Sequence, residues 1–330
     1  MIRLAVPDVL TTNLAGIRLR NPVLLAAGTA GYVDEMAGAL DLSKVGGVVT
    51  KSITRVPREG NNTWRIIESR AGMLNAIGLA NMGIDEFMAT HAPKVKSVPT
   101  TMIGSIAGFS IEDYVHVATA MNAIEAMPAV ELNVSCPNVH GGTEFGVEAA
   151  ALRELVGAVR AVLTTKRLFV KLSPIAVAGP GCTIVDVARA AIEGAGVAGG
   201  PDGRTGADGL SIANTVPAMA VDVRTRVPRL SNVTGGLSGP AVHPIAVKLV
   251  HEVYRKLAKE RGVPIIGIGG VMAWEDAAEL VLVGATAVEM GTALFVNPRS
   301  PLNVVRGLER WVGDQGASSI TELVGAVKLA

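Results

Sequence analysis

The chain has 330 residues, of which 49% are hydrophobic and 18% charged, and its formal net charge is +1. A chain of this length buries a large core, and its balance of charge gives no sign of a nucleic-acid or anionic-membrane partner. No apolar run approaches the roughly 18 residues that span a bilayer. With only Cys136 and Cys182, the chain alone cannot ligate a four-thiolate iron–sulfur cluster, and a reducing cytosol is the expected location.

The first expected element is a hairpin over residues 14–23, after which one theme repeats: an apolar strand, a glycine-rich or polar exit, and an amphipathic helix. Helices are predicted over 111–126 and 147–163, and from a Thr183 cap to about residue 193. Eight strands are predicted, at 23–27, 46–50, 100–106, 129–134, 168–172, 208–213, 263–268 and 286–290. Parallel strands joined by helices form an open doubly wound sheet or a closed barrel. Eight units favour a single α/β domain over 1–330, a (β/α)8 barrel.

Two connections, 53–97 and 215–264, are much longer than the others. Functional barrels place lids and specificity loops in such excursions, so inserted loops are expected over the carboxyl-terminal face of the barrel. The segment 195–207, AGVAGGPDGRTGA, is rich in glycine with little to bury. It is interpreted as a mobile insertion of unknown role.

The stretch 129–139, AVELNVSCPNV, carries the strongest chemical signal. It begins as a strand and ends in a turn at Cys136-Pro137, so Asn133, Cys136 and Asn138 gather where a barrel places its active site. A thiol between two carboxamides suits proton exchange with a ring that the asparagines hold. The alternative is a buried structural thiol with asparagines serving as turn residues.

Glycines follow the last two predicted strands, at Gly269-Gly270 and Gly291-Thr292. Exposed backbone amides at these places form the usual phosphate site of the barrel, although glycines also serve ordinary tight turns. There is no G-x-G-x-x-G after a strand, no Walker loop and no clustered histidine, so neither a Rossmann unit nor a metal site is expected.

Two lysines, Lys51 and Lys171, finish predicted strands. A lysine at a barrel mouth is costly to bury without an anionic partner, although Lys171 also fits a polar member of an inner barrel layer. Carboxamides both donate and accept hydrogen bonds, and they therefore suit a flat ring with alternating C=O and N–H groups. The candidates are Asn75, Asn133, Asn138 and Asn214.

At this point the chain closely resembles the class 1 dihydroorotate dehydrogenases. The matching segments occur in family order: NPVLLAAGT (21–29), TKS (50–52), NAIGLANMG (75–83), ELNVSCPNV (131–139), VKLSP (170–174), ANT (213–215), GGLSGPAVHP (235–244), GIGG (267–270) and MGT (290–292). CPNVHGG and GGLSGPAVHP resemble the NAD-linked branch, class 1B. The catalytic subunit of that branch pairs with a separate iron–sulfur flavoprotein.

The resemblance implies a barrel that holds FMN and oxidises dihydroorotate to orotate in pyrimidine biosynthesis. It assigns Cys136 as the catalytic base and Lys171 as the residue that stabilises the anionic reduced flavin. The implied substrate contacts are Lys51, Asn75, Ala76, Ile77, Gly78, Leu79, Asn133, Asn138, Asn214 and Thr215. The implied FMN contacts are Ala27, Lys51, Ser52, Ser105, Asn133, Lys171, Ala213, Gly239, Gly269, Gly270, Gly291 and Thr292.

The resemblance also implies partners: a homodimer core with an iron–sulfur subunit that contains FAD. Two residues depart from the family pattern, since Ala27 stands where serine is frequent and Ser105 where asparagine is usual. Alternative functions are an FMN barrel acting on a related pyrimidine, the fumarate-linked single-subunit class, and a non-redox isomerase or lyase. Lys51 favours dihydroorotate, because its carboxylate distinguishes it from uncharged pyrimidines.

Overall fold

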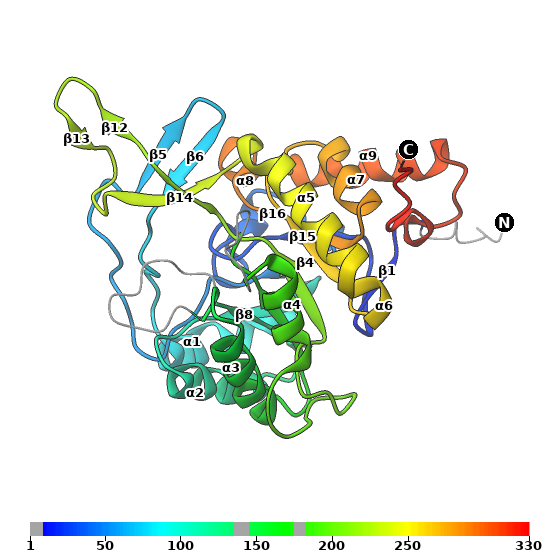
Figure 1. Ribbon diagram of the computed structural model, residues 1–330, viewed down its shortest axis with the longest axis horizontal. Coiled ribbons are helices and arrows are strands. Elements are labelled where there is room, and N and C mark those ends of the chain that lie inside the picture. The colour runs from blue at the N-terminus through cyan, green and yellow to red at the C-terminus, as the bar shows by residue number, and fades with distance from the viewer. Residues whose placement is uncertain (1–8, 135–144, 175–181, 330) are drawn as a thin grey trace.

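The computed structural model describes residues 9–134, 145–174 and 182–329 (Figure 1). Its centre is a closed barrel of parallel strands. The barrel strands are β3 (Val23–Leu25), β4 (Gly47–Val49), β7 (Thr101–Ile106), β8 (Ala129–Asn133), β9 (Arg167–Lys171), β10 (Gly209–Ile212), β15 (Ile265–Ile268) and β16 (Ala285–Met290). Each pairs with the next in this order, and β16 pairs with β3. The eight predicted strands and the (β/α)8 fold are confirmed.

Helices surround the barrel (Figure 1). They are α1 (Ile84–Thr90), α2 (Ile111–Asn122), α3 (Ala149–Val162), α4 (Ile184–Glu193), α5 (His243–Val253), α6 (Lys259–Arg261), α7 (Trp274–Leu282), α8 (Ala293–Val296) and α9 (Ser300–Asp314). A π-helical turn, Tyr254–Ala258, joins α5 to α6. The predicted cap of α4 is confirmed: Thr183 Oγ1 accepts from the Asp186 amide, and the Asp186 carboxylate accepts from the Thr183 amide. Among the described helices, none is long and apolar enough to cross a membrane.

The amino-terminal end of the barrel is closed by the predicted hairpin, β1 (Thr12–Leu14) and β2 (Ile17–Leu19). It begins two residues earlier than expected and turns at Ala15-Gly16. Leu14 and Leu19 are completely buried in a cluster that includes Phe169 and other inward-facing residues of the barrel strands. Apolar side chains thus fill the barrel below the site.

Above this apolar layer the interior becomes charged. Side chains alternate between the two faces of a strand, so residues two apart point the same way. Ala129 and Phe169 belong to the apolar interior, and Glu131 and Lys171 follow two positions later on β8 and β9. On β16, Glu289 follows Ala287 in the same manner. The carboxyl-terminal half of the interior therefore carries ionisable groups.

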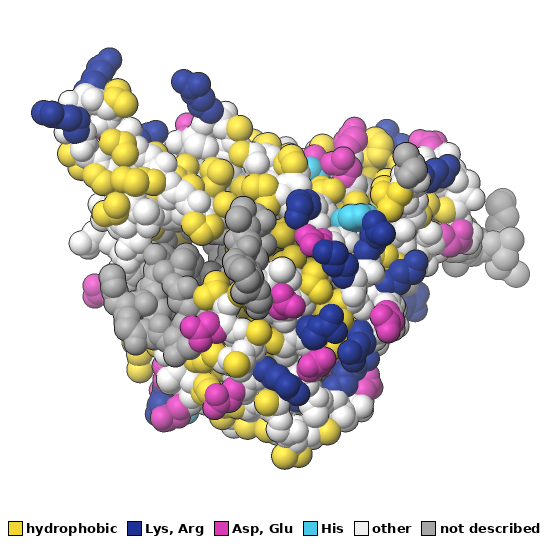
Figure 2. All heavy atoms as spheres, in the orientation of Figure 1, with side chains coloured by type: hydrophobic (Ala, Val, Ile, Leu, Met, Phe, Trp, Pro, Cys, Tyr) yellow, Lys and Arg dark blue, Asp and Glu magenta, His cyan; other side chains and the backbone are white. Residues whose placement is uncertain are grey.

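The two long connections together build a cover over the carboxyl-terminal end. Their strands form one antiparallel sheet in the order β11-β14-β6-β5 and a separate hairpin, β12–β13. Their bounds are β5 (Ile66–Ser69), β6 (Gly72–Asn75), β11 (Val216–Met219), β12 (Val221–Asp222), β13 (Val227–Pro228) and β14 (Thr234–Ser238). Figure 2 shows apolar side chains on the part of the cover that projects around β12 and β13, where Met219, Val223 and Val227 are exposed. The expected loops over this face are thus ordered strands.

The segment 195–207 differs from its expectation. It forms a folded loop at the amino-terminal end of the barrel, opposite the cover. The Ala195 amide donates to the Arg153 carbonyl, and the Thr205 hydroxyl to the Glu193 carbonyl. The backbone of Ala195 also packs directly on Gly157 of α3. Composition alone suggested little to hold this segment, whereas the helices beside it supply the contacts.

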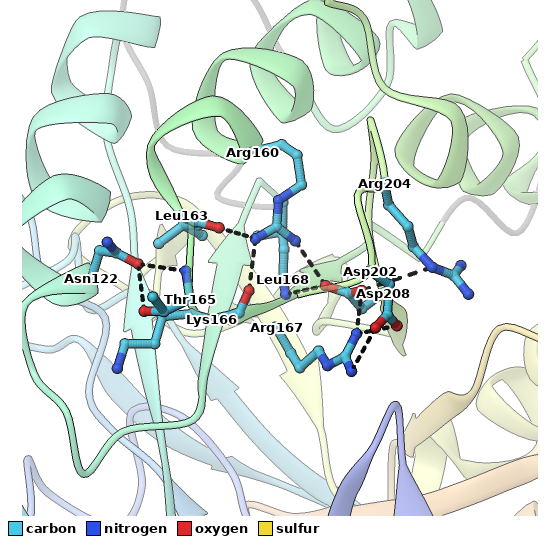
Figure 3. A network of polar contacts seen from close by, with 10 residues as sticks. All are labelled: Asn122, Arg160, Leu163, Thr165, Lys166, Arg167, Leu168, Asp202, Arg204 and Asp208. Atoms are coloured by element: carbon cyan, nitrogen blue, oxygen red, sulfur yellow. Dashed lines mark hydrogen bonds and ion pairs between the residues drawn. The ribbon is translucent and has the colours of Figure 1, made fainter. Parts of the chain in front are cut away.

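Charged contacts beside this loop also hold it against the barrel (Figure 3). Arg160 is fully buried, and its guanidinium donates to Asp208 at 2.8 Å and to the Lys166 carbonyl at 2.7 Å. The Arg167 guanidinium forms ion pairs with Asp208 and with Asp202, and Asp202 belongs to the loop. A buried guanidinium requires such partners. The loop is therefore part of the structure that supports the barrel.

Candidate active site

A cleft lies at the carboxyl-terminal ends of the barrel strands, beneath the cover sheet. Most of the candidate residues within the described chain line it. They are Ala27, Lys51, Ser52, Asn75, Ile77, Gly78, Leu79, Asn133, Lys171, Ala213, Asn214, Thr215, Gly239, Gly269, Gly270, Gly291 and Thr292. Residues from widely separated segments thus meet in one place, as the (β/α)8 topology requires.

Four candidates stand apart. Cys136 and Asn138 lie outside the described residues. Ala76 does not line the cleft but is buried in a small cluster under the cover sheet. Ser105 is also fully buried, and its hydroxyl lies 2.8 Å from that of Ser52. Ser105 therefore stands behind the cleft wall.

A short chain of hydrogen bonds orients the polar wall. The side-chain amide of Asn133 donates to the Ser52 hydroxyl at 3.1 Å, and Ser52 in turn contacts Ser105. The main-chain carbonyl of Asn133 accepts from the Tyr114 hydroxyl at 2.9 Å. On the cover, the side-chain amide of Asn75 donates to the Gly236 carbonyl. The carboxamides are thus held by the surrounding structure, which favours a defined orientation toward a ligand.

One rim of the cleft consists of glycine turns. Gly270 has a φ of +67°, and a Cβ there would lie 2.7 Å from the His243 Cβ and 2.8 Å from the Gly239 carbonyl oxygen. Only glycine allows this close approach. Among the described residues, no acceptor is bonded to the main-chain amides of Gly269, Gly270, Gly291 and Thr292. Free amides converging from two strand exits suit a phosphate group.

Side chains brace this rim from behind. A ring nitrogen of His243, Nδ1, lies 2.8 Å from the Gly269 carbonyl oxygen, and Nε2 lies 2.9 Å from the Glu279 carboxylate. The Thr292 hydroxyl donates to the Ser238 hydroxyl at 2.8 Å. The β15 exit is therefore tied to α5 and α7, and the β16 exit to β14. Ser238, at the end of β14, lines the cleft but was missed in the sequence, because a single serine gives no signal of its own.

Lys51 follows β4 and has no ion-pair partner within the described part of the chain. Burial lowers its pKa, and the nearby charge of Arg65 adds to this effect. An anionic ligand beside Lys51 would offset both the burial of its charge and the repulsion from Arg65. The cleft therefore favours a ligand with negative charge near Lys51.

Lys171 is placed differently from what its sequence neighbours suggested. The sequence around it offered no adjacent carboxylate, yet its Nζ lies 3.6 Å from Glu131 Oε1 and 3.4 Å from Glu289 Oε2. These carboxylates are distant in the sequence, and β8 and β16 bring them to Lys171 on β9. Burial opposes the charge of Lys171, but the two carboxyl groups outweigh it and raise its pKa.

Glu289 lines the cleft and was not identified in the sequence. Burial, together with the charge of Glu131, raises its pKa to about 8, while Lys171 acts in the opposite direction. The signal was present in the two-residue spacing from Ala287, an interior residue, which places Glu289 on the inward side of β16. An acidic residue two positions after an inward alanine marks a polar position inside the barrel.

Known proteins match almost the whole chain. The model of the family "Dihydroorotate dehydrogenase" matches residues 9–312. The "Dihydroorotate dehydrogenase B (NAD(+)), catalytic subunit" of Trichlorobacter lovleyi is 44% identical over 97% of this chain and 98% of its own length. The protein of the same name from Bacteroides thetaiotaomicron is 42% identical over 97% and 99% of the two chains.

A solved structure supports the fold. The crystal structure of DHODH in complex with ferulenol from Eimeria tenella aligns with a TM-score of 0.76 and 22% sequence identity. The alignment covers 99% of this chain and 90% of that one. At this identity the likeness concerns architecture alone. Together with the family match and the close relatives, it shows that the chain belongs to the dihydroorotate dehydrogenase family.

Proposed function

We propose that the chain is the catalytic subunit of an NAD-linked dihydroorotate dehydrogenase, which oxidises dihydroorotate to orotate in pyrimidine biosynthesis. The observation that carries this proposal is one cleft in which carboxamides, a lysine without an ion-pair partner among the described residues, and a glycine rim meet. The relatives that share 42–44% of its sequence bear the name of such a subunit. Enzymes of this family are flavoproteins.

The cleft fits FMN as the flavin. The amides of Gly269, Gly270, Gly291 and Thr292, which have no acceptor among the described residues, suit its phosphate, and Lys171 provides positive charge at the floor. When bound there, FMN supplies an acceptor for the hydride that leaves the substrate. Lys171 and its two carboxyl neighbours sit beneath this position as a fixed group.

The substrate ring is assigned to the carboxamides. Asn75, Asn133 and Asn214 come from the cover and from two barrel strands, and their amides both donate and accept. Lys51 binds the carboxylate, since it is the described cation of the cleft that no carboxylate neutralises. This pairing favours dihydroorotate over an uncharged dihydropyrimidine.

The proton from the ring methylene is assigned to Cys136. A base must reach its proton within a hydrogen bond or through one water, and β8 ends beside the cleft at Asn133, three residues before Cys136. An unperturbed thiol has a pKa of about 8.5, so the reaction should accelerate toward alkaline pH.

The electrons are proposed to leave through a second protein. The chain has two cysteines and no dinucleotide fingerprint, and it therefore cannot carry electrons to NAD through a four-thiolate cluster of its own. We infer a homodimer core with an iron–sulfur subunit containing FAD bound to each copy. The words "catalytic subunit" in the names of the relatives support a partner.

Two experiments test this assignment. Difference spectra of the purified yellow protein should show tight binding of orotate and weak binding of uracil, and the reverse preference would favour a dihydropyrimidine oxidoreductase. The isolated chain should reduce an artificial acceptor with dihydroorotate yet form almost no NADH until the partner is added. Efficient NADH formation by the chain alone would show that no partner is required. Rapid fumarate reduction would place the chain in the single-subunit class.

A further inference from the structure

Three ionisable side chains meet inside the barrel, and the reaction assigned above uses only one of them. Glu131, Lys171 and Glu289 come from β8, β9 and β16, and each is at most 5% exposed. Lys171 lies between the carboxyl groups, at 3.6 Å from Glu131 and 3.4 Å from Glu289. Of the two acids, Glu289 lines the cleft.

The charges of this group do not balance if both acids are ionised. One buried cation compensates one buried carboxylate, and a second anion would remain uncompensated at high cost. Two neighbouring carboxyl groups also resist joint ionisation. At neutral pH one of the two should therefore hold a proton.

The hydrogen bonds indicate which one. Glu131 Oε2 accepts from the Ser211 hydroxyl at 2.8 Å, and this bond stabilises its anion in addition to Lys171. Glu289 accepts from Lys171 at 3.4 Å and lies within hydrogen-bond reach of Glu131, but no hydroxyl group among the described residues donates to it, and the Oε1 atoms of both acids have no donor there. The neutral member of the group is therefore Glu289.

We propose that Glu289 is a positioning residue that acts on the bound flavin through Lys171. While neutral, it leaves Lys171 balanced by Glu131 alone; once ionised, it adds a negative charge under the cleft and disfavours the reduced flavin. The inference rests on the proposed function, because it takes a flavin as the ligand above Lys171.

The surroundings leave few other sources of such an effect. Facing Glu289 across the interior are Glu131 and Lys171, and the adjacent strands β3 and β15 contain no ionisable residue. The remaining described ionisable residue of the cleft lining is Lys51. Burial and Glu131 raise the pKa of Glu289 to about 8, which places its ionisation in an accessible range.

The test is the reduction potential of the flavin in the holoenzyme as a function of pH. In the wild type, the affinity for reduced relative to oxidised flavin should fall about tenfold or more between neutral pH and pH ~9.5, beyond the pH dependence of the flavin itself. Glu289→Gln keeps the shape and a hydrogen-bonding group but cannot ionise, so this extra fall should vanish. An equal fall in Glu289→Gln would overturn the proposal.

Two further variants sharpen the result. In Glu131→Gln, Glu289 becomes the only carboxylate beside Lys171 and should be ionised throughout, so the alkaline step should disappear there too. A step at the same pH in Glu131→Gln would contradict the shared proton. Glu252→Gln removes a carboxylate from the outer side of α5, where it pairs with Lys248 and Lys256, and should keep the wild-type profile.

A flavin-independent measurement separates this inference from the proposed function. The infrared carbonyl band of a buried protonated carboxyl should be present in the wild type at pH 7 and absent in Glu289→Gln. Its absence from the wild type would overturn the inference whatever the protein binds. Failure of dihydroorotate to bleach the wild-type flavin would instead defeat the proposed function and leave the infrared result to decide the protonation.

Discussion

At the level of single residues, some side chains line the cleft where a ligand would bind, and others support them from behind. Lys51 and Asn133 line the cleft, whereas Ser105 contacts it only through Ser52. A serine at position 105 in place of the usual asparagine therefore completes a hydrogen-bond chain within the wall. Contact with FMN would have to come from Ser52 or Asn133 instead.

Cys136→Ser should slow flavin reduction by dihydroorotate at pH 7 by well over tenfold, because a hydroxyl is a much weaker base than a thiol. The defect should shrink as the pH rises. Orotate affinity should stay close to that of the wild type, since the ring is assigned to the asparagines. Stopped-flow bleaching at several pH values measures the effect, and wild-type rates in this variant would place the base elsewhere.

Lys51→Met should weaken orotate binding about 10- to 100-fold, the amount expected for a charge-assisted hydrogen bond. Uracil binding should hardly change, because uracil has no carboxylate. In the wild type, orotate affinity should fall with pH earlier than for an ordinary lysine, since burial lowers the pKa of Lys51. Spectral titrations measure both ligands, with exposed Lys96→Met as the control; equal losses for orotate and uracil would refute the carboxylate assignment.

At the scale of elements, the loop at 195–207 and the network in Figure 3 form a support at the end of the barrel away from the cleft. Asp208 receives hydrogen bonds from Arg160 and from the Leu168 amide, each at 2.8 Å. This support joins α3 to β9 and β10. Loss of this support should therefore change the free energy of unfolding rather than the rate of the reaction.

Asp208→Asn should lower the free energy of unfolding by about 3–5 kcal/mol, because it leaves the Arg160 guanidinium buried without its carboxylate. Asp202→Asn, on the exposed loop, removes a carboxylate from the same network and should have little effect. Denaturant unfolding compares the variants, and flavin bleaching should be unchanged in both at temperatures where they are folded. A loss of bleaching in folded Asp208→Asn would show that this end of the barrel communicates with the cleft.

The elements themselves were largely predictable, because apolar strands with polar exits have a local signature. The barrel strands and the cap at Thr183 needed only sequence neighbours. The cover sheet did not follow, since β14 pairs with β6 across more than 150 residues, as Gly236 and Asn75 do. The partners of Lys171 were equally hidden, because Glu131 and Glu289 meet it only when the barrel closes. Local patterns thus identified most of the residues that line the cleft, and closure of the fold determined its electrostatics.

At the scale of the whole molecule, the buried group at Glu289 couples stability to pH. Its carboxyl group has a pKa of about 8 in the folded chain against 4.5 when unperturbed. A raised pKa means that the stability contributed by the protonated acid is complete below 4.5 and is lost as the pH rises toward 8. The folded chain keeps this proton while the unfolded chain releases it.

Glu289→Gln should therefore gain stability relative to the wild type as the pH rises from 4.5 to about 8, and the difference should level off above that. The reason is that glutamine has no proton to lose on unfolding. Unfolding free energies at several pH values test this, with Glu252→Gln as the control. A difference that stays constant with pH would show that Glu289 is ionised in the folded chain.

The central claim is that this chain transfers hydride from dihydroorotate to a flavin held at the mouth of the barrel. The most direct measurement is anaerobic mixing of the purified protein with dihydroorotate while the flavin absorbance is recorded and the product is assayed. Rapid bleaching is expected with dihydroorotate, with one orotate formed per flavin reduced, and no bleaching is expected with dihydrouracil. A flavin that stays oxidised with dihydroorotate, or that is bleached equally by dihydrouracil, would contradict it.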